Sequence, residues 1–454
     1  MPRRPGSLPL PRRAPPPLPL PWQRLPPRRG ARDGAEAGMD ASSPGFLVGH
    51  AAHPDWRTAL ALACAQIEEQ RRALEAGDEG PLALGFVYFT DHYAGHAEAL
   101  LAALRHGHPG VSWVGAVGVG VVATGVEYFD EPALALMLAP LPAGRFEVFS
   151  GAHKLGRIEA DTALVHADAG TPDLPELIAE MSDRTASGYV FGGVASARGR
   201  AVHVADGVWQ GGLSGVAFSR DVGIVSRVTQ GCRPVGPVRR VTACDGHVVQ
   251  ELDHLPALRC LMDDLGIADE GGLRDALPRL RTTLAGLTAE SRSPLDRGGQ
   301  FGVDTLVRHL VGVDPGRQSV AVADLVQPGM RLAFCRRDVE AARRDLVRVC
   351  SEIRDEIGSR ALPQPEEALA TPAARGAGDG AAALMRGAIY VSCTGRGGPH
   401  FGGPSAELQI VRRALGDVPL VGFFASGEIA HQHLYGYTGV LTVFSRAERG
   451  PPAP

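Results

Sequence analysis

Two glycine-rich stretches near the C-terminus decide the fold that this sequence predicts. They are Val391-Ser392-Cys393-Thr394-Gly395-Arg396-Gly397-Gly398 and Gly422-Phe423-Phe424-Ala425-Ser426-Gly427-Glu428-Ile429. Each contains or follows an apolar run of strand length, so each is interpreted as a turn that leaves a buried strand. Glycines in such turns let backbone N–H groups approach a ligand closely. Because no complete catalytic set lies beside them, the turns favour binding of a small zwitterion or anion over catalysis.

The rest of the chain alternates helical and strand-like patterns, which is typical of a mixed α/β fold. Periodicity predicts helices over residues 55–75, 94–105, 172–183, 254–265, 272–288 and 338–356, with Pro172 at a first helical position. Apolar runs predict strands over residues 82–90, 111–122, 133–141, 189–194, 215–219, 302–311, 318–325, 330–335, 388–392, 418–424 and 437–444. Residues 363–381, rich in Pro, Ala and Gly, predict a flexible loop.

A short unit recurs along the chain: a helix, a strand that ends at glycine, and a returning strand. The first two copies occupy residues 94–105, 111–115 and 132–141, then residues 405–415, 418–422 and 438–445. A third copy is proposed at residues 174–183, 189–193 and 215–219. In this alignment Gly115 corresponds to Gly422, and Gly120 to Gly427. The repeat predicts that its copies share one strand order, with a ligand site between them.

The length of 454 residues and the apolar content of 44% are enough for two or three domains with cores of their own. Composition also sets the N-terminal segment apart from the rest of the chain. Residues 1–44 are predicted to be disordered, because Pro and Arg alternate there and such a segment cannot bury a core. The segment is interpreted as an upstream extension before Met39, with a proline-rich docking tail or a targeting arm as the alternatives.

Composition also excludes several classes of function. The net charge of −4 and the pI of about 6.4 indicate neither nucleic acid nor an anionic membrane as partner. Lys154 is the only lysine and lies outside any phosphate-binding loop, which excludes a Walker A motif. Seven scattered cysteines without a CxxC pair indicate a reduced, cytoplasmic protein. The use of Arg in place of Lys favours a bacterial source with GC-rich coding.

A dinucleotide site is considered at residues 118–123 and set aside. The sequence Gly-Val-Gly-Val-Val-Ala fits the GxGxxA form after a strand. The following residues, 124–129, do not form a helical pattern, and no acidic residue ends a second strand about 20 residues later. A closely packed glycine-rich strand is therefore favoured, and no cofactor is expected.

Cys393 leaves two interpretations open. With His400, His431 or His433 as base it could serve a thiol-dependent hydrolase or transferase. A binding or structural thiol is favoured, since no third orienting group can be named from the spacing. His431 and His433 could also gather with Glu428 and Cys393 around a metal, but this lone His-x-His pair has no fixed partners, and no metal is expected.

Arg396 and Glu428 are the residues rated highest for binding. An arginine can hold a carboxylate through two parallel hydrogen bonds, and a glutamate can accept from an ammonium group. In this interpretation Arg396→Ala abolishes ligand binding and leaves the fold intact. The alternatives are a surface ion pair between the two residues, or pairing of Arg396 with Glu407 on the intervening helix.

At these residues the chain resembles the FIST family, whose members pair a FIST N-terminal with a FIST C-terminal sensory domain. The resemblance spans nearly all of residues 46–446. It is carried by residues 114–121 with Glu127, 132–136, 191–196, 211–212, 230–236, 241–242, 251–253, 256–257, 393–397, Glu407, and 422–429 ending in Thr438. The order of these segments and their coverage make the resemblance specific.

The resemblance implies two lobes, an N-terminal one over residues 45–220 and a C-terminal one over residues 221–446, followed by a short tail at 447–454. It also implies a sensory module for small ligands in signal transduction, with amino acids as the proposed class. No output domain accompanies it, so we expect a sensor that passes its state to a separate partner. The expected cleft is lined by Cys393, Arg396, Gly397, Gly427 and Glu428. Backbone donors are expected from Gly118, Gly120, Gly192, Gly193, Gly231 and Cys232. A further alternative is a scaffold that acts through its proline-rich tail.

Overall fold

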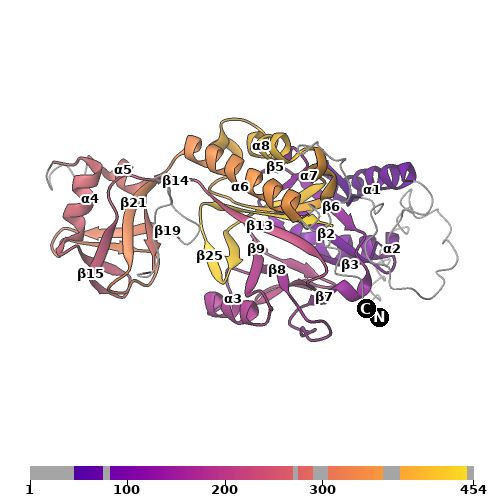
Figure 1. Ribbon diagram of the computed structural model, residues 1–454, viewed down its shortest axis with the longest axis horizontal. Coiled ribbons are helices and arrows are strands. Elements are labelled where there is room, and N and C mark those ends of the chain that lie inside the picture. Colours follow the sequence, from indigo (N-terminus) through magenta and orange to yellow (C-terminus); the bar gives the residue numbers. More distant parts are fainter. Residues whose placement is uncertain (1–44, 75–81, 269–274, 290–304, 361–378, 447–454) are drawn as a thin grey trace, which may run out of the picture.

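The computed structural model describes residues 45–74, 82–268, 275–289, 305–360 and 379–446. Within them the chain has the mixed α/β fold that the sequence predicts. Three six-stranded sheets and their helices form a larger part, the three-sheet body, and a fourth sheet forms a smaller part at the left of Figure 1. The predicted tails at 1–44 and 447–454, and most of the 363–381 loop, lie outside the described residues.

Three copies of one unit build the three-sheet body, which confirms the predicted repeat. Each has a central strand, a helix, a parallel strand and a returning antiparallel strand. The first contains β2 (Leu84–Thr90), α2 (Ala97–Gly107), β3 (Ser112–Gly118) and β6 (Ala133–Ala139). The second contains β8 (Thr162–Ala167), α3 (Leu174–Asp183), β9 (Tyr189–Val194) and β12 (Leu213–Phe218). The third contains β22 (Met385–Cys393), α8 (Ala406–Leu415), β23 (Leu420–Ala425) and β26 (Thr438–Ser445).

Each sheet is widened by an edge strand and completed by a hairpin from another unit. The edge strands are β1 (Leu47–Ala52), β7 (Phe146–Phe149) and β13 (Gly223–Gln230), each antiparallel to the returning strand of its unit. The hairpins are β4 (Gly120–Ala123) with β5 (Val126–Phe129), β10 (His203–Ala205) with β11 (Val208–Trp209), and β24 (Gly427–His431) with β25 (His433–Tyr435). They join β23, β3 and β9 respectively, so the exchange is cyclic.

Glycine is required at one equivalent position of each unit. Gly115, Gly192 and Gly422 lie on the parallel strands, opposite the central strands. A Cβ atom added there would lie 1.7, 1.9 and 1.7 Å from the carbonyl oxygen of the facing residue. No real Cβ contact is that short, which explains why the repeat is visible in the sequence as a glycine after a strand-like run.

The three units meet where their parallel strands end. The Ser196 hydroxyl, after β9, accepts from the Val119 N–H at 2.9 Å and donates to the Phe424 carbonyl. Tyr88 and His166, at equivalent places on two central strands, are both buried, and Tyr88 stacks on Phe423 with ring centroids 5.2 Å apart. One core therefore joins all three units.

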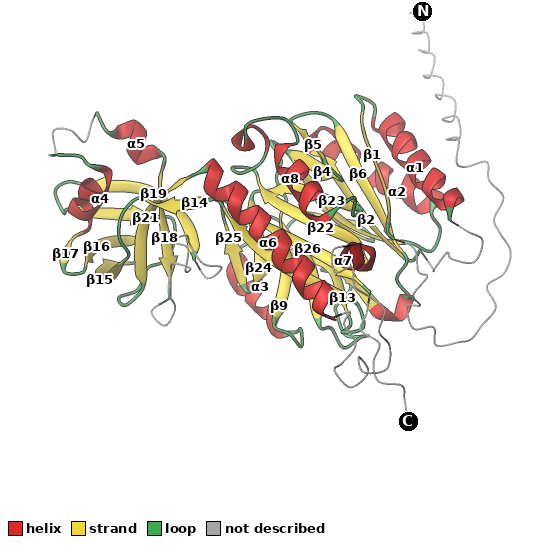
Figure 2. Cartoon of the chain, turned by 45° about the horizontal axis from the view of Figure 1, so that its top comes forward, coloured by secondary structure: helices red, strands yellow, loops and turns green. Residues whose placement is uncertain are grey.

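Helices cover the outer sides of this body. α1 (Trp56–Ala73) packs on the first sheet, with Asp55 as its N-cap, and confirms the predicted helix at 55–75. The long α6 (Val339–Arg360) crosses the third sheet and contacts β13 and α8, as Figure 2 shows. Short helical turns η2 (Asp91–His96), η3 (Ala143–Arg145) and η5 (Gly398–Phe401) complete the connections.

A closed barrel is inserted between β13 and α6. Its elements are β14 (Cys232–Pro234), β15 (Arg239–Asp245), β16 (Val248–Leu252), β17 (Leu255–Pro256), α4 (Ala257–Leu265), α5 (Leu277–Arg281), β18 (Thr283–Thr288), β19 (Leu306–Asp314), β20 (Ser319–Val322) and β21 (Arg331–Arg337). Six strands pair in the order β21-β15-β16-β20-β19-β18 and close where β18 meets β21. This barrel is the smaller part in Figure 1.

Four local predictions are corrected. The predicted helix at 272–288 is wrong beyond Arg281, because residues 283–288 form β18, which pairs on both sides and is buried throughout. The predicted strand at 111–122 breaks at Val119, where the chain passes from one sheet to another. α3 begins at Leu174 with Pro175 in its first turn, so Pro172 precedes it. Residues 379–384 form helix α7 (Asp379–Leu384), which shortens the predicted loop.

Candidate functional site

Two of the predicted site residues meet inside the three-sheet body. Cys393 ends β22 and Glu428 lies on β24, and their side chains are in contact, with the thiol beside the carboxyl group. Glu428 is buried; its Oε2 atom accepts from the Thr438 N–H at 3.2 Å and from the Thr438 hydroxyl at 2.8 Å. Its Oε1 atom has no hydrogen-bond partner among the described residues. The carboxyl group is thus held firmly on one side only.

Burial sets the protonation of this pair. It raises the pKa of Glu428 from 4.5 to about 8, against the hydrogen bonds from Thr438. It also raises the pKa of the Cys393 thiol to about 12, with the Glu428 charge adding to the effect. Near neutral pH the thiol therefore keeps its proton, and a thiolate nucleophile is disfavoured.

Glu428→Gln is expected to flatten the dependence of stability on pH. A carboxyl group with a raised folded-state pKa binds more protons in the folded than in the unfolded chain. Its contribution to the free energy of unfolding is complete below pH 4.5 and is lost as pH rises through about 8. Denaturant unfolding at several pH values should show wild type losing stability across this window relative to Glu428→Gln. Glu98→Gln, at an exposed ion pair with Arg200, should keep the wild-type slope in this window; an unchanged slope in Glu428→Gln would contradict the assignment.

Arg396 lies in a separate, buried network. Its Nε atom donates to Glu407 Oε1 at 2.7 Å, and its side chain is 1% exposed while that of Glu407 is 0% exposed. Another guanidinium nitrogen donates to the Thr229 hydroxyl at 3.1 Å, and the group stacks over Phe401 with 5.1 Å from its Cζ atom to the ring centroid. The sequence left open a surface ion pair of Arg396 with Glu428 and a pair of Arg396 with Glu407. The structure contains the pair with Glu407.

Glu407 is the centre of this network. Besides Arg396, it accepts from the Tyr390 hydroxyl at 2.6 Å and from the Ser392 hydroxyl at 3.0 Å. Glu127, from the exchanged hairpin β4–β5, accepts from the backbone N–H groups of Glu407 and Leu408 at 3.1 and 3.2 Å. Glu127 therefore holds the N-terminal turn of α8 against another unit's hairpin. Burial, with the nearby Glu407 charge, raises the pKa of Glu127 to about 7.

A cavity of 560 Å³, the junction cavity, lies between the barrel and the three-sheet body. The barrel supplies Leu306, Val307, Arg308, His309, Ala323 and Asp324. The body supplies Cys393, Thr394 and Gly395, then Ser426 and Gly427, residues 432–437 and Pro175. Of the predicted site residues, Cys393 and Gly427 line this cavity, and Glu428 lies directly behind Cys393. Arg396 and Gly397 do not line it.

Polar contacts bridge the two walls of the junction cavity. Arg308 pairs with Asp324 at 2.7 Å on the barrel side and also donates to the Leu434 carbonyl of the body at 2.9 Å. The ring of His309 is hydrogen-bonded to the Tyr437 hydroxyl. Sequence reasoning missed these barrel residues, because nothing in strand-like residues 306–314 distinguishes the wall of a cavity from an ordinary barrel surface.

The remaining predicted glycines lie apart from the junction cavity. Gly118 ends β3 and packs against residues 423–424, and Gly120 begins β4 and packs against residues 128–129 and 424. Gly192 and Gly193 lie inside β9 rather than in a turn. Gly397 packs against the Phe424 ring, leaving no room for a side chain. Gly231 lies beside the Arg396 guanidinium, and Cys232 is buried in the first barrel strand next to Cys335.

The histidines considered as bases or ligands are spread over different surroundings. His400 is hydrogen-bonded to Arg337, and burial together with that positive charge lowers its pKa to about 4. His433 lines the junction cavity, whereas His431 lines a different groove. Among the residues that the structure describes, no three His, Cys, Asp or Glu side chains gather in a metal-binding arrangement.

Comparison with known proteins now decides the family. Residues 83–255 match the FIST N domain and residues 257–431 match the FIST C domain. The chain belongs to the FIST family. It is similar to uncharacterized proteins of Mycobacterium tuberculosis strain H37Rv and Mycobacterium bovis, each 30% identical to it. These alignments cover 87% of this chain and 98% of each relative.

The family assignment adds a broad role. FIST domains are associated with sensory signal transduction. The two matched segments meet inside the barrel of this FIST protein, between β17 and α4, and together they contribute all the walls of the junction cavity except for residues 432–437. No helix in the described parts of the chain is both long enough and apolar enough to cross a membrane.

Proposed function

We propose that this FIST protein is a sensor for a small metabolite, which binds in the junction cavity. The observation that carries the proposal is that the cavity takes its walls from two parts of the molecule, the barrel and the three-sheet body. A ligand there contacts both parts at once. The volume of the junction cavity, 560 Å³, lies within the range of small-molecule sites.

The wall chemistry favours a small polar ligand such as an amino acid. The Arg308–Asp324 pair offers both signs of charge, and His309, His433 and Tyr437 add groups that donate or accept hydrogen bonds. A zwitterion can satisfy both charged groups without leaving either side chain unpaired. Glu428, whose Oε1 atom lacks a partner among the described residues, lies behind Cys393 as a further hydrogen-bonding group.

The connection between barrel and body supports a change in barrel orientation as the signal of binding. The chain enters the barrel after Gly231 and leaves it before Asp338, and the Asp338 N–H donates to the Gly231 carbonyl at 2.9 Å. Both connections thus lie side by side and form a narrow neck. A ligand that contacts both walls favours one orientation of the barrel, to the extent that it binds that orientation more tightly. A separate partner would then recognise the favoured orientation.

A thermal-shift screen of the full chain against amino acids and small carboxylates tests this function. A ligand present at 100 times its dissociation constant stabilises the fold by about 2.7 kcal/mol. Ser426→Trp, which fills the cavity from an exposed position, should remove the shift. Ala186→Trp, an exposed residue in another pocket, is the matched control and should keep it. No shift with any ligand, or a shift that persists in Ser426→Trp, would contradict the proposal.

A thiol-dependent enzyme is the weaker proposal. The contact between Cys393 and Glu428 would supply an acceptor for the thiol proton once Glu428 is ionised, above its pKa of about 8. Burial opposes this role, because it raises the pKa of the thiol to about 12. Alkylation of the native protein by iodoacetamide at pH 7.5, mapped by mass spectrometry, distinguishes the two. Rapid, selective alkylation of Cys393 would favour the enzyme, and protection of Cys393 would favour the sensor.

A further inference from the structure

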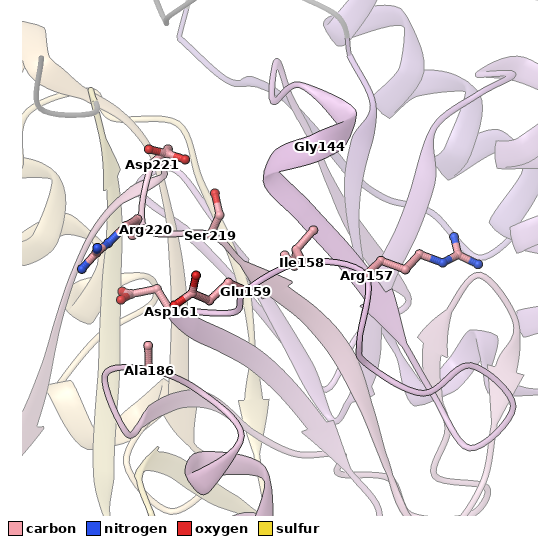
Figure 3. Close-up of a pocket in the computed structure, with 9 residues that line it drawn as sticks. All are labelled: Gly144, Arg157, Ile158, Glu159, Asp161, Ala186, Ser219, Arg220 and Asp221. Carbon is pink, nitrogen blue, oxygen red and sulfur yellow. The ribbon is translucent and has the colours of Figure 1, made fainter. Parts of the chain in front are cut away.

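The edge strand β13 faces a groove on the surface of the three-sheet body. This edge groove has a volume of 760 Å³, and its walls include Ile224, Ser226, Arg227, Tyr189, Glu356 and His431. It continues into a hollow of 300 Å³ with which it shares Asp161, Arg220 and Asp221. Figure 3 shows this hollow, with the side chain of Arg157 pointing away from those of Asp161, Arg220 and Asp221. An elongated surface therefore runs beside the strand.

The backbone of β13 is open toward this groove. Among the described strands β13 pairs with β26 alone, and in an antiparallel pair alternate residues direct both N–H and C=O to one side. The Gln230 N–H donates to Asp345 at 2.7 Å, so Gln230 faces away from β26. Ile224 and Ser226 have the same parity, and both line the groove. Their outward N–H groups can therefore donate to an added strand.

In the first unit, side chains of helix α1 cover the equivalent edge strand, β1. On β1, the Gln70 side chain accepts from the Val48 N–H at 3.1 Å and donates to the Val48 carbonyl at 2.6 Å. Gln66 does the same for His50, at 3.1 and 2.8 Å. These two glutamines of α1 replace a neighbouring strand, which is one way that proteins protect sheet edges.

The third unit lacks this protection at the equivalent residue. Leu136 and Leu441 are equivalent residues of the two returning strands. Gly49 pairs with Leu136 and Arg227 pairs with Leu441, so the preceding residues, Val48 and Ser226, also correspond. The Ser226 carbonyl accepts from the Arg227 guanidinium, but α6 offers no glutamine to the Ser226 N–H. Instead, Glu352 and Glu356 of α6 hold the Arg227 side chain. In the second unit the edge strand β7 is short, with four residues.

The charges of the groove select the kind of segment that fits. Glu356 pairs with Arg227 and Arg360, and Asp221 pairs with Arg145 outside the groove. Arg220 and Arg446 also line the groove, and neither forms an ion pair with a carboxylate of the described residues. Asp161 is the lining carboxylate left to oppose them. Four arginines and three carboxylates line the groove, so it has an excess of one positive charge, which complements acidic side chains.

We propose that the edge groove binds an extended, acidic segment of a partner protein, which adds a strand to β13. The main-chain groups of Ile224 and Ser226 would hold the segment, and Arg220 and Arg446 would select its acidic side chains. This proposal is independent of the ligand in the junction cavity, since the two sites share no lining residue.

Fluorescence anisotropy with the full chain tests the proposal. The probe is a short fluorescein-labelled peptide of alternating Val and Glu, and the control peptides are its Val–Lys counterpart and an N-methylated version. We expect saturable binding of the acidic peptide alone. Ile224→Pro, which removes the outward N–H and keeps the pairing with β26, should weaken binding about tenfold. Ile224→Ala keeps the N–H and should bind more tightly than Ile224→Pro.

Charge reversal supplies a second readout. Arg220→Glu should weaken binding of the acidic peptide at least fivefold, whereas Arg317→Glu, on an exposed turn of the barrel, should leave it unchanged. Absence of binding, or binding that Ile224→Pro does not weaken, would overturn the proposal. Light scattering that shows a dimer of the full chain, lost in Ile224→Pro, would also overturn it and assign the groove to a second copy of the chain.

Discussion

Arg396→Ala is expected to lower the free energy of unfolding by about 3–5 kcal/mol, the usual cost of removing one partner of a buried ion pair. The substitution would remove the guanidinium from the Glu407 carboxylate, whose side chain is 0% exposed. Only the hydroxyl groups of Tyr390 and Ser392 would still donate to it from side chains. It would also remove the contact with the Phe401 ring. Urea unfolding monitored by circular dichroism measures the effect.

Two further variants make this test specific. Arg412→Ala breaks an ion pair with Asp417 in which both side chains are largely exposed, so it should cost no more than about 1 kcal/mol. Arg396→Met combined with Glu407→Gln removes both charges and should recover much of the lost stability. A loss below about 1 kcal/mol in Arg396→Ala would show that the buried pair contributes little to stability and would contradict the structural role.

The repeat could be predicted from sequence because it depends on close packing. Gly115 and Gly422 lie where a parallel strand has no space for a side chain, so the position allows no other residue. The exchange of hairpins could not be predicted in this way. Residues 111–122 form one apolar run, and the transfer to another sheet at Val119 changes neither the polarity nor the length of that run. Strand patterns indicate which residues are buried, and do not indicate against which sheet.

The candidate site shows the same limit. Cys393, Arg396 and Glu428 stand out in the sequence because charged or reactive groups beside glycine-rich turns are unusual. The structure places Cys393 with Glu428, and Arg396 with Glu407, in two buried clusters that share no hydrogen bond among the described residues. The Arg396 charge still acts to lower the pKa of Glu428. The barrel wall of the junction cavity could not be predicted, because Arg308 and Asp324 reach the cavity only through the closure of the barrel. Composition of a single strand contains no information about that closure.

Fragments 45–220 and 221–446 are expected to fail to fold separately and to assemble when they are produced together. The predicted boundary lies between β12 and β13, where one unit ends and the next begins. Even so, the hairpin β4–β5 of the first fragment completes the sheet of the second, and β24–β25 of the second completes a sheet of the first. Each fragment alone would leave strand edges unpaired and would lose the part of the shared core that the other fragment supplies.

The size of this effect follows from the residues at the exchange. Four apolar residues of the exchanged hairpins are 0% exposed in the whole chain: Val121 and Val122 on β4, and Ile429 and Ala430 on β24. In the separate fragments, β4 of the first and β24 of the second would be exposed to water. Exposed apolar edge strands also promote aggregation. Separately expressed fragments should therefore be insoluble, whereas co-expressed fragments should co-purify in a 1:1 complex with the circular dichroism of the intact chain. Replacing Gly422 by Val in the second fragment should prevent the complex, because its side chain would overlap the Tyr390 carbonyl. Two soluble, cooperatively unfolding fragments would instead mean that each lobe is an independent domain and that the exchanged hairpins add little to its stability.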